Sequence, residues 1–225
     1  MLSSLHTVLC LKYICFILVV CVNFGCGTSA PRGWLNYDSS PVLFMQRIPF
    51  LSFFFNRLLS PRYPPNIQYG NILKGLNIPP SSVDFVYSSH VIEHLTFSQS
   101  LICFNKVYKM LKPGGVFRAV MPDLASSINT YINSSSATPS VDFMKETLLG
   151  QFSTPVSPRQ YLSNIFSSPS HKWLWDYKSV SHHLHCVGFS SVRSAVFNDS
   201  SFSDVFLSVE SPSRWQSCLG FECIK

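Results

Sequence analysis

The sequence predicts an α/β fold in which a mostly parallel sheet carries helices on both faces. Two observations support this fold. Apolar runs rich in β-branched residues end in glycine or polar turns, as buried parallel strands do. A segment with helical spacing of its apolar residues, 98–111, lies between two such runs. The 225 residues can bury one sizeable core of this kind but are too few for an assembly of several domains.

The first strand has to be separated from an apolar N-terminus. Tyr13–Val22 is an unbroken apolar run behind Lys12. It is shorter than the roughly 20 residues of a membrane span unless it extends back to Val8, and it lacks the basic start and small-residue exit of a secretory signal. A buried strand is the third interpretation, and the residues that follow favour it. We expect residues 1–18 to be an apolar extension, helical or anchor-like, and membrane contact through residues 1–22 stays open.

A glycine turn follows this strand. Asn23-Phe24-Gly25-Cys26-Gly27 brings bare backbone amides close to a ligand, because no Cβ blocks the approach at the glycines. A second strand, 34–37, ends in Asp38, whose carboxylate can accept hydrogen bonds from both hydroxyls of a ribose. Only 13 positions separate Gly25 from Asp38, fewer than the roughly 20 of a dinucleotide fingerprint, and Ala30 replaces its third glycine. The pattern favours a nucleoside ligand over a dinucleotide.

The middle of the chain repeats strand, helix and strand. Ser82–Tyr87 is the expected strand, the helix follows over 98–111, and Lys112-Pro113-Gly114-Gly115 ends it before the strand Val116–Val120. A shorter strand is expected at Ile67–Tyr69. In such parallel sheets the ligand lies at the carboxyl ends of the strands.

The composition limits the partners. Charged residues make up 12% of the chain, about half the usual share. The net charge is +6, but the basic residues are scattered, so we expect no nucleic-acid partner. The eight cysteines form no C-x-x-C pair or zinc-finger ligand set, so we expect reduced core thiols, no metal and a cytoplasmic location, with membrane association through the N-terminus as the alternative.

Taken in order, these motifs resemble the class I S-adenosylmethionine-dependent methyltransferases, and most closely the small bacterial methyltransferase-domain proteins. The segments that carry the resemblance are Val22–Gly27, Gly33–Asp38, Tyr87–Leu95, Leu111–Gly115, Met121–Leu124, His171–Tyr177, Gly188-Phe189 and the final Cys218–Cys223 strand. The resemblance covers about residues 19–224. It implies a Rossmann-like, doubly wound, mostly parallel seven-stranded sheet over 19–225, with a lid-like insertion at about 125–175. It also implies S-adenosyl-L-methionine as cofactor and a small-molecule or glycan-type acceptor.

The resemblance assigns cofactor-binding roles residue by residue. The turn Gly25, Cys26 and Gly27 would lie under the methionine part, Asp38 would bind the ribose, and Asn71 would read the adenine. Ser88 and Ser89, at the end of the fourth strand, would border the methyl-transfer site. Two positions depart from the family pattern, because Asn23 replaces an acidic residue and Ser29 replaces a glycine.

Candidate catalytic and acceptor-binding residues are fewer. His90 and His94 are candidates for a general base, since histidine titrates near neutral pH. For His94, a bracing role at the helix start is the stronger alternative. His171, Asp176 and Tyr177 are candidates for the substrate side, although Asp176 could instead cap a helix. We expect solvent-exposed or packing roles for His182, His183 and His185.

Loops and alternatives complete the prediction. Residues 134–140 and 151–170 are Ser- and Pro-rich loops on either side of a short amphipathic piece, Val141–Leu149, and we expect acceptor choice to reside in this region. Phe44–Leu59 is expected to pack its aromatic residues into the core rather than expose them to lipid. A non-catalytic relative with a degraded cofactor site, or a membrane-tethered form of either protein, is the alternative function. The oligomeric state is left open.

Overall fold

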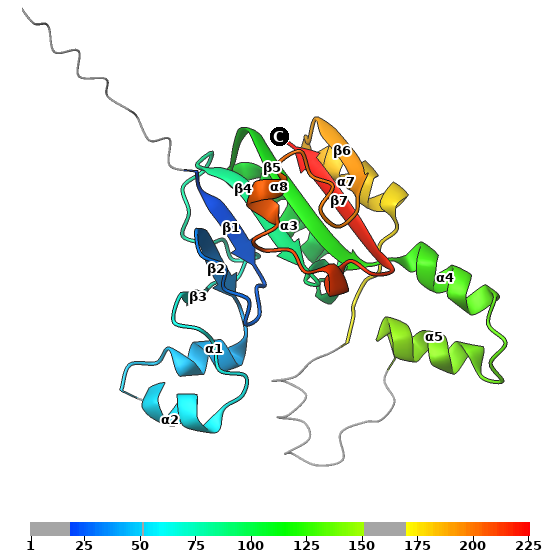
Figure 1. Cartoon of the computed structure of the whole chain (residues 1–225), viewed down its shortest axis with the longest axis horizontal. Helices are drawn as coiled ribbons and strands as arrows, with labels where there is room; N and C mark the ends of the chain where they lie inside the picture. The colour runs from blue at the N-terminus through cyan, green and yellow to red at the C-terminus, as the bar shows by residue number, and fades with distance from the viewer. Residues whose placement is uncertain (1–18, 51, 151–169) are drawn as a thin grey trace, which may run out of the picture.

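The computed structural model describes residues 19–50, 52–150 and 170–225, and its centre is one seven-stranded sheet (Figure 1). The strand order is β3-β2-β1-β4-β5-β7-β6, with β7 antiparallel to both of its neighbours and all other pairs parallel. The strands are β1 (Cys21–Phe24), β2 (Trp34–Asp38), β3 (Ile67–Tyr69), β4 (Val83–Ser89), β5 (Leu111–Pro122), β6 (Ser191–Ala195) and β7 (Cys218–Ile224). The expected fold class is confirmed. Our predictions for residues 1–18 and for most of the loop at 151–170 fall outside the described residues.

The described helices lie between the strands, singly or in groups. They are α1 (Pro41–Gln46), α2 (Ser52–Leu58), α3 (Phe97–Met110), α4 (Leu124–Ile132), α5 (Pro139–Thr147), α7 (Tyr177–Val187) and α8 (Ser203–Phe206), with two 3-10 turns, η1 (Ile92–His94) and η2 (Pro212–Arg214). None of the described helices has both the length and the apolar character needed to cross a bilayer.

The long helix α3 matches its sequence pattern closely. Thr96 caps it, because its side chain accepts from the Gln99 amide while the Gln99 side chain accepts from the Thr96 amide. This reciprocal capping box satisfies two amides that the first helical turn leaves without partners. The helix buries Cys103, Phe104 and Val107 against the sheet, and so forms the main layer on that face.

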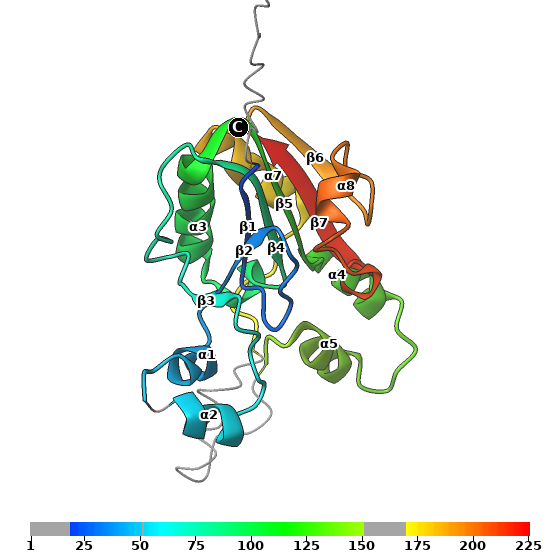
Figure 2. The same ribbon diagram turned by 60° about the vertical axis from the view of Figure 1, so that its left-hand side comes forward.

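The two faces of the sheet are covered differently, as Figure 2 shows. Helices α3 and α7 cover one face over the larger apolar core, which includes Val86, Phe104 and Phe221. The other face is covered by the chain between β6 and β7, residues 196–217, which holds only the short α8 and η2. There Phe206 and Trp215 pack over strand residues such as Tyr87 and Trp34.

A buried ion cluster fixes the 196–217 segment to the sheet. Arg118 of β5 is completely buried and pairs with Glu210, with Asp199 at 2.9 Å and with Glu222 of β7 at 3.1 Å. Its guanidinium also lies 4.5 Å from the centre of the Trp215 ring. Because a buried cation is stable only when it is fully paired, this cluster determines where the segment lies.

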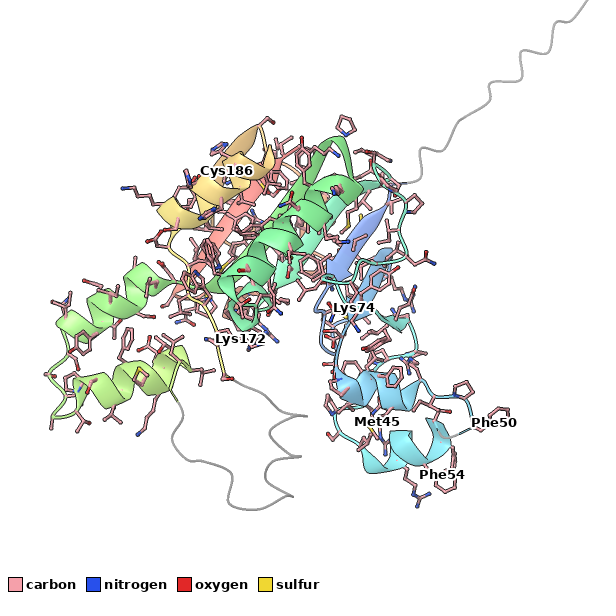
Figure 3. All side chains as sticks on the ribbon, turned by 180° about the vertical axis from the view of Figure 1, so that it is seen from behind. Met45, Phe50, Phe54, Lys74, Lys172 and Cys186 are labelled. Carbon is pink, nitrogen blue, oxygen red and sulfur yellow. The ribbon has the colours of Figure 1, made fainter. Side chains whose placement is uncertain are left out.

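One packing prediction was wrong. Helices α1 and α2 do not bury the aromatic residues of Phe44–Leu59, since Phe44, Phe50, Phe53 and Phe54 are 51%, 97%, 70% and 60% exposed. Figure 3 shows Phe50 and Phe54 pointing away from the sheet at the outer end of these helices. The physical reason is position, because α1 and α2 lie beyond the carboxyl end of β2 and cover neither face of the sheet. Phe44 finds a partner only in the half-exposed Tyr69 ring, 5.0 Å away.

Other local predictions agree with the structure. The amphipathic piece at 141–149 is α5, which begins at Pro139, and α4 and α5 form a hairpin that projects from the end of β5 (Figure 1). The histidines of α7 have the expected surface or packing roles, since His182 and His185 are exposed and His183 packs on the rings of Phe97 and Trp175.

Candidate active site

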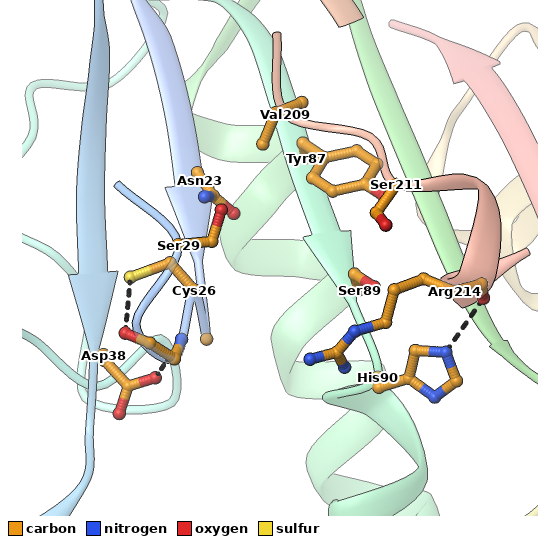
Figure 4. A pocket seen from close by; sticks show the side chains of 12 residues that line it. Asn23, Cys26, Ser29, Asp38, Tyr87, Ser89, His90, Val209, Ser211 and Arg214 are labelled. Atoms are coloured by element: carbon orange, nitrogen blue, oxygen red, sulfur yellow. Dashed lines mark hydrogen bonds between the residues drawn. The ribbon is translucent and has the colours of Figure 1, made fainter. Parts of the chain in front are cut away.

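A pocket of about 250 Å³ opens at the carboxyl ends of β1, β2 and β4 (Figure 4). Three strands and the segment between β6 and β7 supply its wall. The lining residues are Asn23, Gly25, Cys26, Gly27, Ser29, Asp38, Tyr87, Ser89, His90, Val209, Ser211 and Arg214. The pocket therefore lies where ligands bind in parallel α/β sheets.

The glycine turn is shaped by close approach. Gly25 and Gly27 have φ angles of +64° and +56°, a region that residues with a Cβ rarely adopt. A Cβ on Gly25 would lie 2.2 Å from Cγ2 of Val91, in the loop after β4, whereas no atom lies within 4 Å of a Cβ built on Gly27. Gly25 thus lets two loops of the pocket touch, and Gly27 leaves open space for a ligand.

Asp38 is connected to this turn. Its Oδ2 accepts the Gly27 amide at 2.8 Å and its Oδ1 accepts the Ser40 amide at 2.8 Å. Burial raises the pKa of Asp38, and these two hydrogen bonds oppose that rise. Each carboxylate oxygen keeps a second lone pair, so Asp38 can still accept hydrogen bonds from two hydroxyls.

Cys26 is held as a thiol in the same turn. Burial and then the neighbouring Asp38 raise its pKa to about 12. Its amide donates to the Tyr37 carbonyl at 3.1 Å and its carbonyl accepts the Ser29 amide at 2.9 Å. The thiol is therefore a neutral wall of the pocket and not a nucleophile at neutral pH.

The deep wall carries hydroxyls that lack partners. The hydroxyls of Tyr87 and Ser89 are buried near each other, and neither makes a hydrogen bond of normal geometry among the described residues. Burial raises the pKa of Tyr87 to about 12. Buried polar groups normally have partners, so these two hydroxyls are suited to a polar ligand.

His90 lies at the opposite side of the pocket from Asp38 in a strained conformation, with φ +55°. Its Nε2 is 3.0 Å from the Arg214 carbonyl oxygen and its Nδ1 is 3.2 Å from Oε1 of Glu93. The Cys218 side chain and then Glu93 raise the pKa of His90 to about 10. Because both ring nitrogens face acceptors, the ring is protonated and donates from both.

The remaining predicted residues lie outside the pocket wall. Asn71 uses its Oδ1 to accept the Leu73 amide at 2.8 Å, and the buried Ser88 hydroxyl lacks a partner in the described chain. Asp176 caps α7 by accepting the Ser179 amide at 2.7 Å, and the Tyr177 hydroxyl donates to the Val192 carbonyl at 3.2 Å. Asp176 thus caps a helix, which was the alternative to a role on the substrate side.

His94 and His171 form a second cluster with Glu93. Their rings are 5.0 Å apart, and burial lowers the pKa of His171. Nδ1 of His94 donates a hydrogen bond to the Ser170 carbonyl oxygen, 3.2 Å away. Neither histidine lines the pocket at the carboxyl ends of β1, β2 and β4.

Sequence reasoning missed the far wall of the pocket. Val209, Ser211 and Arg214 come from a segment that carries no recognisable motif, and Tyr87 was treated only as a strand residue. The alternating pattern of β4 could have assigned Tyr87 to one face. Nothing local in the sequence indicates that residues 209–214 return to the glycine turn.

Comparison with known proteins gives one family match and a set of similar solved structures. Residues 22–119 match the family model described as "Methyltransferase domain", and no curated protein matches the chain. Among solved structures, the chain is similar to a SAM-dependent methyltransferase from Archaeoglobus fulgidus, with 15% identity, 92% of this chain and 86% of that chain covered, and a TM-score of 0.49. A Mesorhizobium loti methyltransferase gives 14% identity, 92% and 91% coverage, and a TM-score of 0.47.

A third similar structure is longer. Phosphoethanolamine N-methyltransferase 2 of Haemonchus contortus, solved with S-adenosyl-L-methionine, is 14% identical, and the match covers 92% of this chain but 48% of that one, with a TM-score of 0.45. The chain thus spans about half the length of that enzyme. The open turn at Gly27, the Asp38 carboxylate and the partnerless hydroxyls fit an adenosyl cofactor. With the family match, they identify residues 22–119 as a class I S-adenosylmethionine-dependent methyltransferase domain.

Proposed function

We propose that the protein transfers the methyl group of S-adenosylmethionine to a small-molecule or glycan-type acceptor. One observation carries the proposal. The pocket at the carboxyl ends of β1, β2 and β4 combines an open glycine turn, the Asp38 carboxylate and two buried hydroxyls without partners. This set matches a ligand with a sugar, an amino acid part and a positive charge.

Different residues of the pocket would bind different parts of the cofactor. Asp38 would accept the ribose hydroxyls, and the Gly25–Gly27 turn would lie under the methionine part. The pocket volume of about 250 Å³ is slightly below the roughly 300–1,000 Å³ of small-molecule sites. The adenine would therefore extend past the end of β2 toward Asn71. The Asn71 amide nitrogen would remain available there, because only its oxygen binds the Leu73 amide.

Arg214 adds a charge that sequence reasoning did not include. Its guanidinium points into the pocket toward Ser89 (Figure 4), and no salt bridge occupies it within the described residues. A guanidinium can bind a carboxylate through two parallel hydrogen bonds. We assign it to the carboxylate of the methionine part or to an acidic acceptor.

The cofactor supplies an activated methyl group on a sulfonium, so the chain mainly has to position the acceptor and exclude water. His90 is a poor base at neutral pH, because Glu93 and the Arg214 carbonyl hold its ring protonated. An imidazolium at this position would instead orient an acceptor oxygen. His94, the other candidate base, does not line the pocket.

We assign the choice of acceptor to residues about 125–175, which would form a lid-like insertion. The hairpin of α4 and α5 exposes apolar side chains, among them Ile132 at 71% and Tyr131 at 43%. The chain returns from this region to the active-site side, where the Lys172 amide donates to the Glu93 carbonyl at 2.7 Å. Specificity then varies with the hairpin while the cofactor pocket stays constant.

The test is formation of S-adenosylhomocysteine with a panel of small hydroxyl, amine and glycan acceptors. We expect the parent protein and the Asp204→Ala control, whose side chain is exposed outside the pocket, to turn over the same acceptor. Asp38→Ala should lose this turnover. Cofactor binding without turnover on any acceptor of the panel would favour the non-catalytic alternative.

A further inference from the structure

The cluster of Glu93, His94 and His171 carries an inference beyond methyl transfer. One potential ligand atom from each residue lies within 4.8 Å of the other two. Two of the residues belong to η1, and the third lies near the end of the insertion, 77 positions further along the chain than His94. We propose that these three side chains bind one divalent transition-metal ion of the zinc class.

The buried carboxylate is the strongest argument. Glu93 is 1% exposed, and its Oε2 has no hydrogen-bond partner among the described residues. Its Oε1 lies 3.2 Å from Nδ1 of the His90 ring. A buried carboxylate with one oxygen left without a partner is costly, and a cation bound at that oxygen would remove the cost. His90 would then orient the ligating carboxylate from outside the ion's coordination.

The two imidazoles are arranged as ligands. The Ser170 carbonyl can only accept, so the contact at 3.2 Å places a proton on Nδ1 of His94 and leaves the lone pair on Nε2. Metal-binding histidines commonly donate their second nitrogen to a carbonyl in this way. Nδ1 of His171 is buried and has no hydrogen-bond partner in the described chain.

The geometry needs only a small closure. Bonds of about 2.1 Å around a tetrahedral zinc ion place ligand atoms roughly 3.4 Å apart, and the present limit is 4.8 Å. Small side-chain rotations supply the difference. Both histidines are partly exposed, which gives an ion a path from solvent. The absence of a C-x-x-C pair and of zinc-finger spacing led us to expect no metal, and a cluster that joins Glu93 and His94 to the distant His171 has no such local pattern.

The donor set also indicates what the ion would do. Two histidines and one carboxylate leave a coordination position open, as in catalytic zinc sites. Since Glu93 contacts His90 of the cofactor pocket, the ion would lie one side chain away from the pocket wall and would hold Glu93 against His90. Any effect of the ion on catalysis rests on the proposed methyl transfer, whereas metal binding does not.

The experiment is titration of the metal-free full-length protein with Zn²⁺ and with Co²⁺, followed by calorimetry and the visible Co²⁺ spectrum. We expect one ion per chain, and Glu93→Gln or His171→Asn should weaken binding by at least about tenfold. The control is His182→Ala, which removes an exposed histidine 3.6 Å from the Cys186 thiol. This exposed histidine and thiol are a pair that could bind an ion adventitiously. This variant should bind the ion like the parent.

Two results would overturn the metal-site proposal. Binding that is lost in His182→Ala and kept in Glu93→Gln would overturn the proposal, as would a folded parent that takes up no ion. Circular dichroism checks folding, and His171→Asn decides the question if Glu93→Gln does not fold. Cofactor binding, measured separately without metal, shows whether the methyltransferase proposal fails or only the metal site does.

Discussion

At the scale of single residues, Gly25 is the most constrained position of the pocket. A Cβ there would meet Val91 at 2.2 Å, on a backbone with φ +64°. The positive φ alone costs about 1–2 kcal/mol for a residue with a Cβ. Steric overlap with Val91 adds to that cost and would separate the two loops.

Gly25→Ala should therefore lower the free energy of unfolding by clearly more than Gly33→Ala. Gly33 also has a positive φ, +83°, but no atom lies within 4 Å of its added Cβ. Urea denaturation of both variants measures the difference. Equal losses would mean that Val91 does not press on Gly25.

Cys26 gives a second residue-scale prediction, based on pH. With its pKa raised to about 12, roughly one thiol in ten thousand is ionised at pH 8. Alkylation by iodoacetamide should therefore be slow at Cys26 and speed up as the pH rises toward 10, because the thiolate is the reactive form. The exposed Cys186 of α7 (Figure 3) is the internal reference.

Site-resolved mass spectrometry checks this prediction. Labelling of Cys26 at pH 8 as fast as that of Cys186 would show that the thiol is neither buried nor raised in pKa. Added S-adenosylmethionine should slow the Cys26 reaction further at every pH, since the thiol lines the proposed cofactor pocket.

At the scale of elements, the segment between β6 and β7 depends on Arg118. This guanidinium contacts Glu210, Asp199 and Glu222, and two of these three side chains are at most 7% exposed. Removing the cation would leave the buried Glu210 carboxylate without its ionic partner, whereas Asp199 and Glu222 would keep Arg193. Such a change typically costs about 3–5 kcal/mol.

Arg118→Met should thus unfold at much lower urea concentration and lose the pocket wall at residues 209–214. Arg193→Met is the matched control, since Arg193 pairs with the same Asp199 and Glu222 but is 39% exposed. The loss of stability in Arg193→Met should be clearly smaller than in Arg118→Met. Equal stability of the two variants would contradict a positioning role for the buried cluster.

Some of these elements could be predicted from the sequence alone, and others could not. Strands such as β2 and β4 were predictable, because their apolar runs end in turn residues and parallel burial leaves no place for charge. The exposed rings of α1 and α2 were not, because an aromatic run does not reveal whether it covers a sheet. The wall at 209–214 depends on contacts of Arg118 with residues 81 to 104 positions away, which no local pattern contains.

At the scale of the whole molecule, the sheet brings segments distant in sequence to one edge. The glycine turn and Asp38 follow from the first two strands, and the resemblance gave their roles. The meeting of His171 with Glu93 follows instead from the return of the chain near the end of the insertion. A motif reveals residues that bind together locally, whereas a site built from two distant segments requires the fold.

The central claim is that the pocket at β1, β2 and β4 binds S-adenosylmethionine. Isothermal titration calorimetry of the full chain with this cofactor, and with S-adenosylhomocysteine, tests it most directly. Asp38→Ala removes hydrogen bonds to a charged acceptor worth about 1.5–3 kcal/mol, so affinity should fall roughly tenfold to a hundredfold, while Asp204→Ala binds like the parent. No heat of binding at millimolar cofactor in the folded parent, or unchanged affinity in Asp38→Ala, would contradict the claim.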